Sequence, residues 1–209
     1  MWAIAAALLL SPGCGAVEQE LVAQVDAAAD APAPEVDAPV ADAAIDAPAS
    51  DAPAIDAAPV PHLVFVTSTT TTGALGGLAG ADARCQTLAA SVGLGGTYRA
   101  ILADEHQSVF QRIAIGGPVR NLQGTVLAAD AATFFAGTDL LPNSVTERGE
   151  QLTEPTVAWI GGGTLSCAGW TSDSASVSGG LTFVTANQWS RLTANTSCIA
   201  SVRLQCISQ

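Results

Sequence analysis

The spacing of apolar residues along the C-terminal part of the chain predicts a helix in one stretch and a strand in another. One set of apolar residues recurs every three or four positions and would form a single face of a helix: Leu78, Ala81, Cys85, Leu88, Ala89 and Val92. Asp82 falls in the predicted first turn of this helix, where a negative charge is favourable, and Gly93 is a typical residue to end it. Near the C-terminus, Val202, Leu204 and Cys206 alternate with polar residues, which predicts a strand with Cys206 facing the interior.

Shorter patterns predict the remaining elements. Runs typical of strands occupy residues 63–66, 98–102, 124–127 and 157–160. Residues 105–115 predict a second, short helix, with Asp104 as its N-cap and Gln107 completing a capping-box-like pair. Because the predicted helices come early and most of the predicted strands come late, the sequence predicts an α+β fold.

The N-terminal residues have the pattern of an export signal. Residues 2–10 form a nine-residue apolar run, which is typical of a signal peptide and too short to span a bilayer. Cys14 follows this run, at the place where bacterial lipoproteins are cleaved and acylated. We therefore expect residues 1–14 to be a lipoprotein-type signal peptide, and lipid on Cys14 to anchor the protein to the outer membrane of a bacterial cell envelope. Secretion after ordinary cleavage is the alternative.

The composition changes sharply behind this signal. Residues 15–61 consist largely of Ala, Asp, Pro and Val, and they carry ten of the 19 acidic residues and no basic one. Irregularly spaced prolines and mutual repulsion of the charges predict a disordered linker. Residues 62–209 hold all seven basic residues, each an arginine, against nine acids, and we expect them to form one domain. A nearly neutral domain without basic clusters is a poor candidate for binding nucleic acid.

The five cysteines divide into one and four. Cys14 belongs to the signal, whereas Cys85, Cys167, Cys198 and Cys206 all lie in the predicted domain. An even number of cysteines behind an export signal predicts two disulfides formed in an oxidising compartment. Four cysteines can pair in three ways, and their positions alone leave all three open.

Several segments of residues 62–209 together resemble a known family. They are Phe65-Val66-Thr67, residues 76–85 (GGLAGADARC), residues 96–100 (GTYRA), Trp159-Ile160-Gly161, Cys167 with Trp170-Thr171-Ser172, Asn187-Gln188-Trp189, and Cys198 with Cys206. The domain resembles the C-type lectin-like fold in its bacterial endostatin-like branch, known from leptospiral proteins. The resemblance implies nested disulfides, Cys85 with Cys206 and Cys167 with Cys198.

The calcium ligands of sugar-binding C-type lectins do not match this sequence. Those lectins hold calcium through an EPN or QPD tripeptide after the WIG strand and a WND tripeptide before the third cysteine. Here the second tripeptide is Trp189-Ser190-Arg191, which puts a cation where a carboxylate is needed, and Glu154-Pro155-Thr156 precedes Trp159 instead of following it. Calcium requires several converging oxygen ligands, so we expect no calcium-dependent sugar binding and no cofactor.

Other candidate chemistry is equally sparse. His62 and His106 have no partner at the spacing of a zinc site. Asp104-Glu105-His106 lacks the nucleophile of a catalytic triad and is more typical of a capped helix start. We therefore expect no metal site and no enzyme activity.

The strand-and-loop half of the domain offers the predicted ligand surface. Residues 161–188 are rich in Gly and Ser, and we expect them to form long loops that carry recognition, with Trp170, Thr171 and Asp173 as the contact residues. The sequence thus predicts a monomeric, calcium-independent surface module that binds an extracellular protein, matrix component or glycan. A structural envelope lipoprotein without a dedicated ligand is the alternative.

Overall fold

The computed structural model describes residues 58–138 and 140–209. The predicted signal peptide, the lipidation of Cys14 and nearly all of the predicted linker lie outside these residues. Within the described part of the chain, none of the helices is both long and apolar enough to cross a membrane. The first strand begins at His62, the residue at which the sequence predicts the domain to start.

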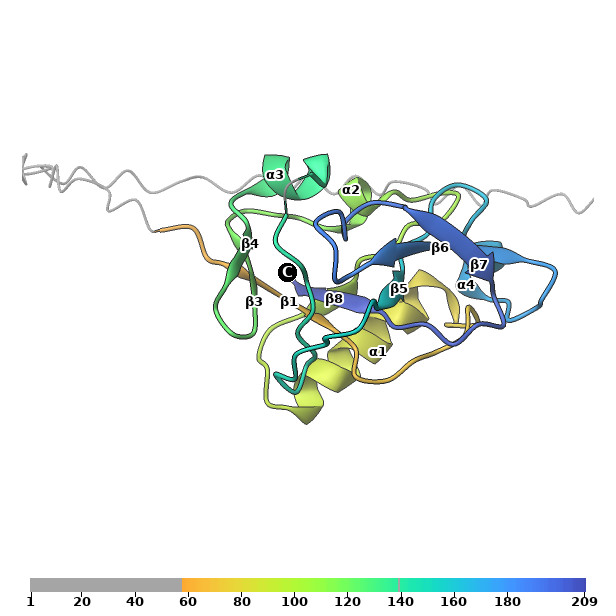
Figure 1. The fold of residues 1–209 in the computed structure, drawn as a ribbon, viewed down its shortest axis with the longest axis horizontal. Coiled ribbons are helices and arrows are strands. Elements are labelled where there is room, and N and C mark those ends of the chain that lie inside the picture. The colour runs from red at the N-terminus through yellow and green to blue at the C-terminus, as the bar shows by residue number, and fades with distance from the viewer. Residues whose placement is uncertain (1–57, 139) are drawn as a thin grey trace, which may run out of the picture. The chain divides into compact units, whose positions relative to one another are not determined.

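Five strands form the main sheet, in the order β2-β8-β1-β3-β4. Figure 1 labels four of them, β8, β1, β3 and β4. The strands are β1 (His62–Val66), β2 (Tyr98–Ala100), β3 (Val119–Asn121), β4 (Val126–Ala128) and β8 (Gln205–Ser208). β1 runs parallel to β3 and antiparallel to β8, and the other neighbouring strands are also antiparallel. The first and the last strand of the domain therefore lie side by side at the centre of the sheet.

A second, antiparallel sheet consists of three strands in the order β5-β6-β7. They are β5 (Val157–Trp159), β6 (Ser178–Phe183) and β7 (Ala194–Ser197). Gly179 of β6 lies so close to its surroundings that a Cβ atom there would be 2.6 Å from the Trp159 ring and 2.6 Å from the Cys167 sulfur. The absence of a side chain at this position is what lets the tryptophan and the disulfide pack on the strand.

The long helix that the apolar spacing predicts is confirmed as α1 (Gly77–Ser91), which buries Ala81, Cys85 and Ala89. Gly93 follows it in the left-handed conformation, with φ +77°, as a residue that ends a helix commonly does. Asp82 lies one turn later than predicted, because the helix begins at Gly77.

The second predicted helix is shorter than expected and starts later. α2 spans only Val109–Arg112, and the Gln111 side chain accepts a hydrogen bond of 2.8 Å from the Ser108 amide at its start. The carboxylate of Asp104 instead accepts the amides of His106 and Gln107, at 2.8 and 2.7 Å. Such a turn uses the same side-chain chemistry as an N-cap without starting a helix, which explains the wrong prediction.

Two further short helices complete the domain. α3 (Ala131–Ala136) is capped by Asp130, whose side chain accepts the Thr133 amide at 2.7 Å. α4 (Cys167–Trp170) is a turn with left-handed backbone angles. The sequence did not predict α3, α4, β3, β6 or β7.

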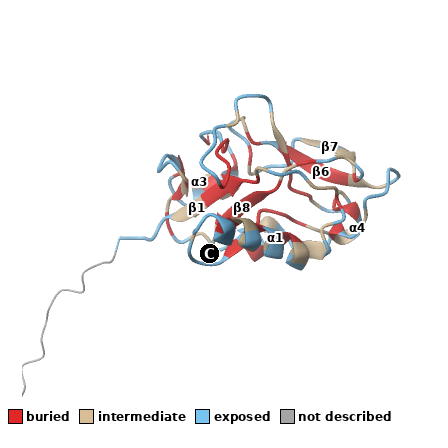
Figure 2. Cartoon of the chain, turned by 90° about the horizontal axis from the view of Figure 1, so that it is seen from below, coloured by how far each residue is buried: buried red, intermediate tan, exposed pale blue. Residues whose placement is uncertain are grey.

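The main sheet has a separate hydrophobic core on each face, and β1 and β8 lie buried between them (Figure 2). Phe65 of β1 and Cys206 of β8 pack in the core that contains the buried face of α1. Their neighbours Val64 and Ile207 pack in the other core, with Phe134 of α3. The alternation predicted for the last strand is thus confirmed at Cys206, which points toward α1. The fold is α+β, as the sequence predicts.

Candidate ligand-binding surface

Two disulfides link distant parts of the domain. Cys85 on α1 is bonded to Cys206 on β8, with Cα atoms 5.5 Å apart, and Cys167 in α4 is bonded to Cys198 just after β7, with Cα atoms 5.7 Å apart. All four side chains are fully buried. The nested pairing that the resemblance implies is therefore confirmed.

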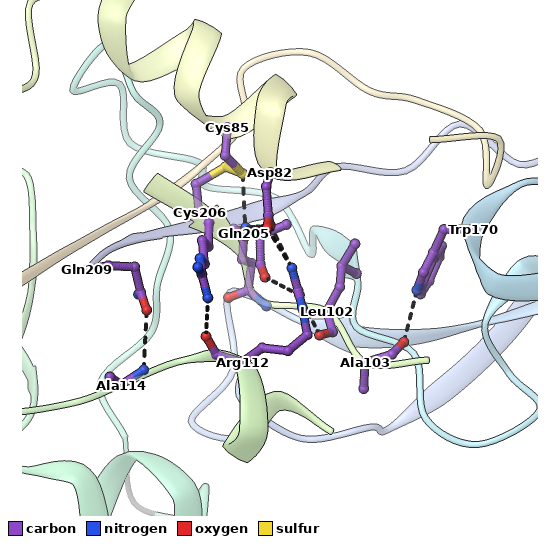
Figure 3. A network of polar contacts seen from close by, with 12 residues as sticks. Asp82, Cys85, Leu102, Ala103, Arg112, Ala114, Trp170, Gln205, Cys206 and Gln209 are labelled. Carbon is purple, nitrogen blue, oxygen red and sulfur yellow. Dashed lines mark hydrogen bonds and ion pairs between the residues drawn. A yellow bond between two sulfur atoms is a disulfide. The ribbon is translucent and has the colours of Figure 1, made fainter. Parts of the chain in front are cut away.

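The GGLAGADARC segment, residues 76–85, serves the architecture of the domain. A Cβ atom on Gly80 would lie 2.0 Å from the Leu75 carbonyl oxygen, so this position accepts only glycine. The carboxylate of Asp82 accepts the backbone amide of Ala100 at 2.9 Å and the guanidinium of Arg112 at 2.7 and 2.8 Å (Figure 3). The segment thus joins α1 to β2 and α2, and its most distinctive residues are explained without a ligand.

A buried carboxylate fixes the Ser/Thr-rich stretch after β1. The side chain of Glu147 is 1% exposed and accepts the backbone amide of Ser68 at 2.7 Å and also the Ser68 hydroxyl. Both oxygens are therefore used to hold residues 67–72 against the 144–150 turn. This acid also has a structural role.

Each of the three tryptophans of the domain is fully buried and holds a different loop. The indole N–H groups of Trp159, Trp170 and Trp189 donate to the carbonyl oxygens of Thr71, Ala103 and Leu141, at 3.0, 2.9 and 2.8 Å respectively. Trp159 and Trp170 also pack edge to face, with ring centroids 5.7 Å apart.

The prediction that Trp170 contacts a ligand is therefore wrong, since a side chain that is 0% exposed cannot line a ligand surface. It was predicted from its polar sequence context, but the adjacent disulfide and the Ala103 carbonyl draw it into the core. The neighbouring Thr171 and Asp173 do lie at the surface, and the Thr171 hydroxyl donates to the Ala168 carbonyl at 2.7 Å. Whether these two residues contact a ligand stays a prediction.

Residues 161–188 are not the continuous loop that the sequence predicts. They contain β6, the central strand of the second sheet, and the α4 turn. Four consecutive residues of this turn have positive φ, between +50° and +65°: Cys167, Ala168, Gly169 and Trp170. Three of them are not glycine, so the conformation is unfavourable by itself and depends on the disulfide and the buried indole. A Gly- and Ser-rich composition is typical of loops. Here small residues such as Gly179 are instead needed because Trp159 and the Cys167 sulfur pack closely against the strand.

The described residues do not bring metal ligands together. Within residues 58–138 and 140–209, no three His, Cys, Asp or Glu side chains lie close enough to hold an ion. Ser190, which belongs to the Trp189-Ser190-Arg191 tripeptide compared above with a calcium motif, donates its hydroxyl to the Phe134 carbonyl at 2.9 Å. His106 lies on a surface loop with a side chain that is 81% exposed, 3.5 Å from Glu105.

A hollow of about 600 Å³ opens between the start of α1, the end of β2 and the segment that leads into α2. We call it the polar hollow, and its lining residues are Leu78, Ala79, Asp82, Arg99, Asp104, His106, Gln107, Gln111 and Arg112. Its volume is in the range of sites for small ligands. Seven of the nine lining side chains can donate or accept hydrogen bonds.

The floor of the polar hollow is rigid. Arg112 is 6% exposed, and its guanidinium donates to the carbonyl oxygens of Ala100 and Leu102, at 3.0 and 2.8 Å, besides its two bonds to Asp82 (Figure 3). These contacts fix α2 against β2. A fully bonded buried pair of this kind positions its neighbours and has few groups left for a ligand.

The groups above this floor are less committed. Arg99 uses one guanidinium nitrogen to donate to the Arg112 carbonyl at 2.9 Å, and one oxygen of Asp104 accepts the two loop amides. For the second oxygen of Asp104 and the second terminal nitrogen of Arg99, the described part of the chain supplies no hydrogen-bond partner. Two arginines and two aspartates line the hollow, so their formal charges cancel.

An exposed aromatic pair lies on the same short helix. Phe110 of α2 is 64% exposed and stacks on Phe135 of α3, with ring centroids 4.1 Å apart. Phe135 in turn packs edge to face on the buried Phe134, with centroids 5.0 Å apart. Phe110 and Gln111 are consecutive residues, so the aromatic pair and the polar hollow flank one turn of helix.

Sequence reasoning missed both features. Each depends on α2, which the pattern placed too early, and the polar hollow combines residues 78–82 with residues 99–112. The exposed Phe110 lies in residues 105–115, which the sequence predicts to be a short helix, and that prediction does not mark Phe110 as exposed. No family model matches this chain.

Proposed function

We propose that this protein is a calcium-independent binding module of a bacterial cell surface, built on the C-type lectin-like fold. The two sheets, the helix α1 across the terminal strands and the nested disulfides are consistent with that fold. Acylation of Cys14 would hold the module at the outer membrane, and residues 15–61 would serve as its tether. In the secreted alternative the same domain acts in solution.

The polar hollow is the observation that supports the proposal. Its amide, guanidinium, carboxylate and imidazole groups donate and accept hydrogen bonds, whereas its formal charge is balanced. A balanced set of this kind suits the hydroxyl groups of a neutral glycan better than a phosphate or an ammonium ion, which would need a net opposite charge. No bound ion is required, because the protein groups supply both donors and acceptors.

The aromatic pair supports a second ligand class, a protein. An exposed phenylalanine that rests on a rigid aromatic neighbour resembles the anchors that contribute most to protein–protein affinity. Apart from Phe110 and Phe183, which are 64% and 40% exposed, most aromatic side chains of the domain are buried. Of the aromatic side chains in residues 58–138 and 140–209, Phe110 is therefore the most accessible to a partner.

Arrays of glycans and of extracellular matrix proteins test the proposal. The full-length protein is applied with and without a calcium chelator, beside Arg99→Gln for the polar hollow and Phe110→Ser for the aromatic pair. We expect binding that survives the chelator and is weakened by one of the two substitutions. Absence of binding to every arrayed ligand would favour the structural envelope protein, and binding lost with the chelator would exclude the calcium-independent module.

A further inference from the structure

His62 ties three segments together through both of its ring nitrogens. It is the first residue of β1, and its Nδ1 lies 2.9 Å from the Ser208 carbonyl oxygen at the end of β8. Its Nε2 lies 2.9 Å from the Gly116 amide nitrogen. A backbone amide can only donate, so Nε2 must accept with its lone pair, and the proton of the neutral ring must be on Nδ1.

Gly116, whose amide donates to the imidazole, lies in residues 113–118, which connect α2 to β3. Two other hydrogen bonds hold the same connection: the Ala114 amide donates to the Gln209 side chain at 3.2 Å, and the His62 amide donates to the Pro118 carbonyl at 2.8 Å. Gly116 itself is exposed, and its amide is bonded to the imidazole alone among the described residues. Loss of the imidazole acceptor would therefore leave that amide to water.

None of the side chains that line the hollow beside His62 carries a compensating charge. His62 borders a second hollow, of about 540 Å³. Its lining includes Ser208 at the end of β8, the following Gln209, Ala114 and Gly116 of residues 113–118, and Tyr98 of β2. Among the side chains that line this hollow, that of Tyr98 is the one other titratable group, and none carries a formal charge at neutral pH. A proton on Nε2 would place a positive charge there and turn an acceptor into a donor that faces another donor.

We propose that His62 is an acid-sensitive latch on the connection behind α2. At neutral pH the imidazole accepts the Gly116 amide and fixes residues 113–118 to β1 and β8. Protonation breaks this bond and loosens the connection. Because α2 carries part of the polar hollow, acid would also weaken ligand binding there, a consequence that rests on the proposed function.

Hydrogen exchange of the Gly116 amide in the full-length protein tests the latch. We expect its protection factor, corrected for the intrinsic pH dependence of exchange, to fall at least about tenfold between about pH 8 and about pH 5. His62→Gln should remove this dependence, because an amide oxygen can accept from Gly116 without titrating. His106→Gln changes the other histidine of the chain and should behave like the wild type.

A protection factor of Gly116 that does not change over this range would overturn the proposal. A change of equal size in His62→Gln would do the same. The tautomer gives an independent check that needs no variant, since nitrogen NMR of the wild type at about pH 8 should find the His62 proton on Nδ1. The affinity of the wild type and of His62→Gln for the tightest glycan of the array, measured at both pH values, tests the link to the polar hollow separately, because His106 lines that hollow in both proteins. An equal pH dependence of affinity in the two proteins would overturn that link and leave the latch standing.

Discussion

Tyr98 is the single tyrosine of the chain, and its hydroxyl is buried without a hydrogen-bond partner among the described residues. Its ring packs against Phe65, with centroids 5.5 Å apart. Burial raises the pKa of this phenol above its ordinary value of 10.0, because the charged form loses its hydration. The folded protein therefore keeps Tyr98 neutral at a pH where the unfolded chain ionises it.

The raised pKa of Tyr98 should make the folded protein less stable at alkaline pH. Below pH 10.0 both states are neutral at this position, and the contribution of Tyr98 to stability is constant. As the pH rises above that value, ionisation favours the unfolded chain, and stability is lost progressively until the folded-state pKa is reached. We expect the free energy of unfolding of the wild type to fall in this range, and that of Tyr98→Phe to fall less. Denaturant titrations at neutral and alkaline pH measure the difference.

Tyr98→Phe also has a predicted effect at neutral pH. Removing a buried hydroxyl that has no partner should leave the domain equally stable or stabilise it. A loss of more than about 1 kcal/mol in the free energy of unfolding would contradict the burial of an unpaired hydroxyl. Tyrosinate absorbance reports Tyr98 without interference from other tyrosines.

Gly80 is a helical glycine whose replacement by alanine should destabilise the protein, contrary to the usual effect. Replacing a helical glycine by alanine generally stabilises a protein by up to about 1 kcal/mol. Inside α1, however, the new Cβ would meet the Leu75 carbonyl oxygen at 2.0 Å, and backbone cannot give way cheaply. We expect Gly80→Ala to lower the midpoint of thermal unfolding markedly.

Gly95→Ala is the matched control for this substitution. A Cβ at Gly95 has nothing within 4 Å, and the residue does not have a positive φ. The control should therefore be neutral or slightly stabilising. Equal midpoints for the two variants would show that the close approach at Gly80 is absent.

At the scale of elements, α1 protects the outer edge of β2. The Tyr98 and Ala100 amides of this edge strand do not pair with another strand there. They donate instead to side chains of α1, Gln86 at 2.8 Å and Asp82 at 2.9 Å. Side-chain acceptors one helical turn apart thus match alternate residues of the strand, and the edge is closed against pairing with other chains.

Asp82→Asn tests this junction. Asparagine can still accept the Ala100 amide, but it no longer neutralises Arg112, whose side chain is 5% exposed. We expect a loss of about 3 kcal/mol in the free energy of unfolding, because an uncompensated charge stays buried. Glu105→Gln removes a surface pair with His106 and should cost no more than about 0.5 kcal/mol. Similar losses in both variants, measured by denaturant titration, would contradict the structural role of Asp82.

The helices α1 and α2 differ in how far the sequence predicts them, and the reason is physical. α1 was predictable because its apolar face repeats over fifteen residues and one glycine ends it. α2 has only four residues, too few for a period, and Asp104 offered a capping signal that belongs to a turn. Trp170 was misplaced because local composition does not record that its indole reaches Ala103, 67 positions away.

At the scale of the molecule, the disulfides join segments that the chain visits at opposite ends of the domain. The Cys85–Cys206 bond spans 121 residues and the Cys167–Cys198 bond spans 31. Longer loops restrict the unfolded chain more, so the chain-entropy model gives about 5 and about 4 kcal/mol for the two bonds. The outer bond should therefore contribute more to stability.

Removing each bond as a pair of alanines tests this ranking. Cys85→Ala with Cys206→Ala should lower the free energy of unfolding by about 1 kcal/mol more than Cys167→Ala with Cys198→Ala. Denaturant titration of both variants beside the wild type measures the order. A clearly larger loss for the inner pair would mean that the left-handed α4 turn, which that bond holds, outweighs chain entropy.

The candidate site could not be predicted from the sequence, because it exists only once distant segments meet. Arg99, Asp104 and Gln111 are individually ordinary surface residues. They line one hollow because the Asp82–Arg112 pair draws α2 against α1 and β2. The pairing of the cysteines, by contrast, was accessible through the resemblance, although their positions alone left three choices.

The affinity of Arg99→Gln for the tightest neutral glycan from the array, measured by calorimetry in chelator, tests the proposed module most directly. Arg84→Gln is the matched control, since Arg84 is exposed on α1 outside the polar hollow and, among the described residues, its guanidinium donates to the Thr70 carbonyl alone, at 3.5 Å. We expect Arg99→Gln to raise the Kd at least about tenfold, the cost of one hydrogen bond to a charged group, and Arg84→Gln to leave it unchanged. Equal Kd values for Arg99→Gln and the wild type would contradict binding in the polar hollow.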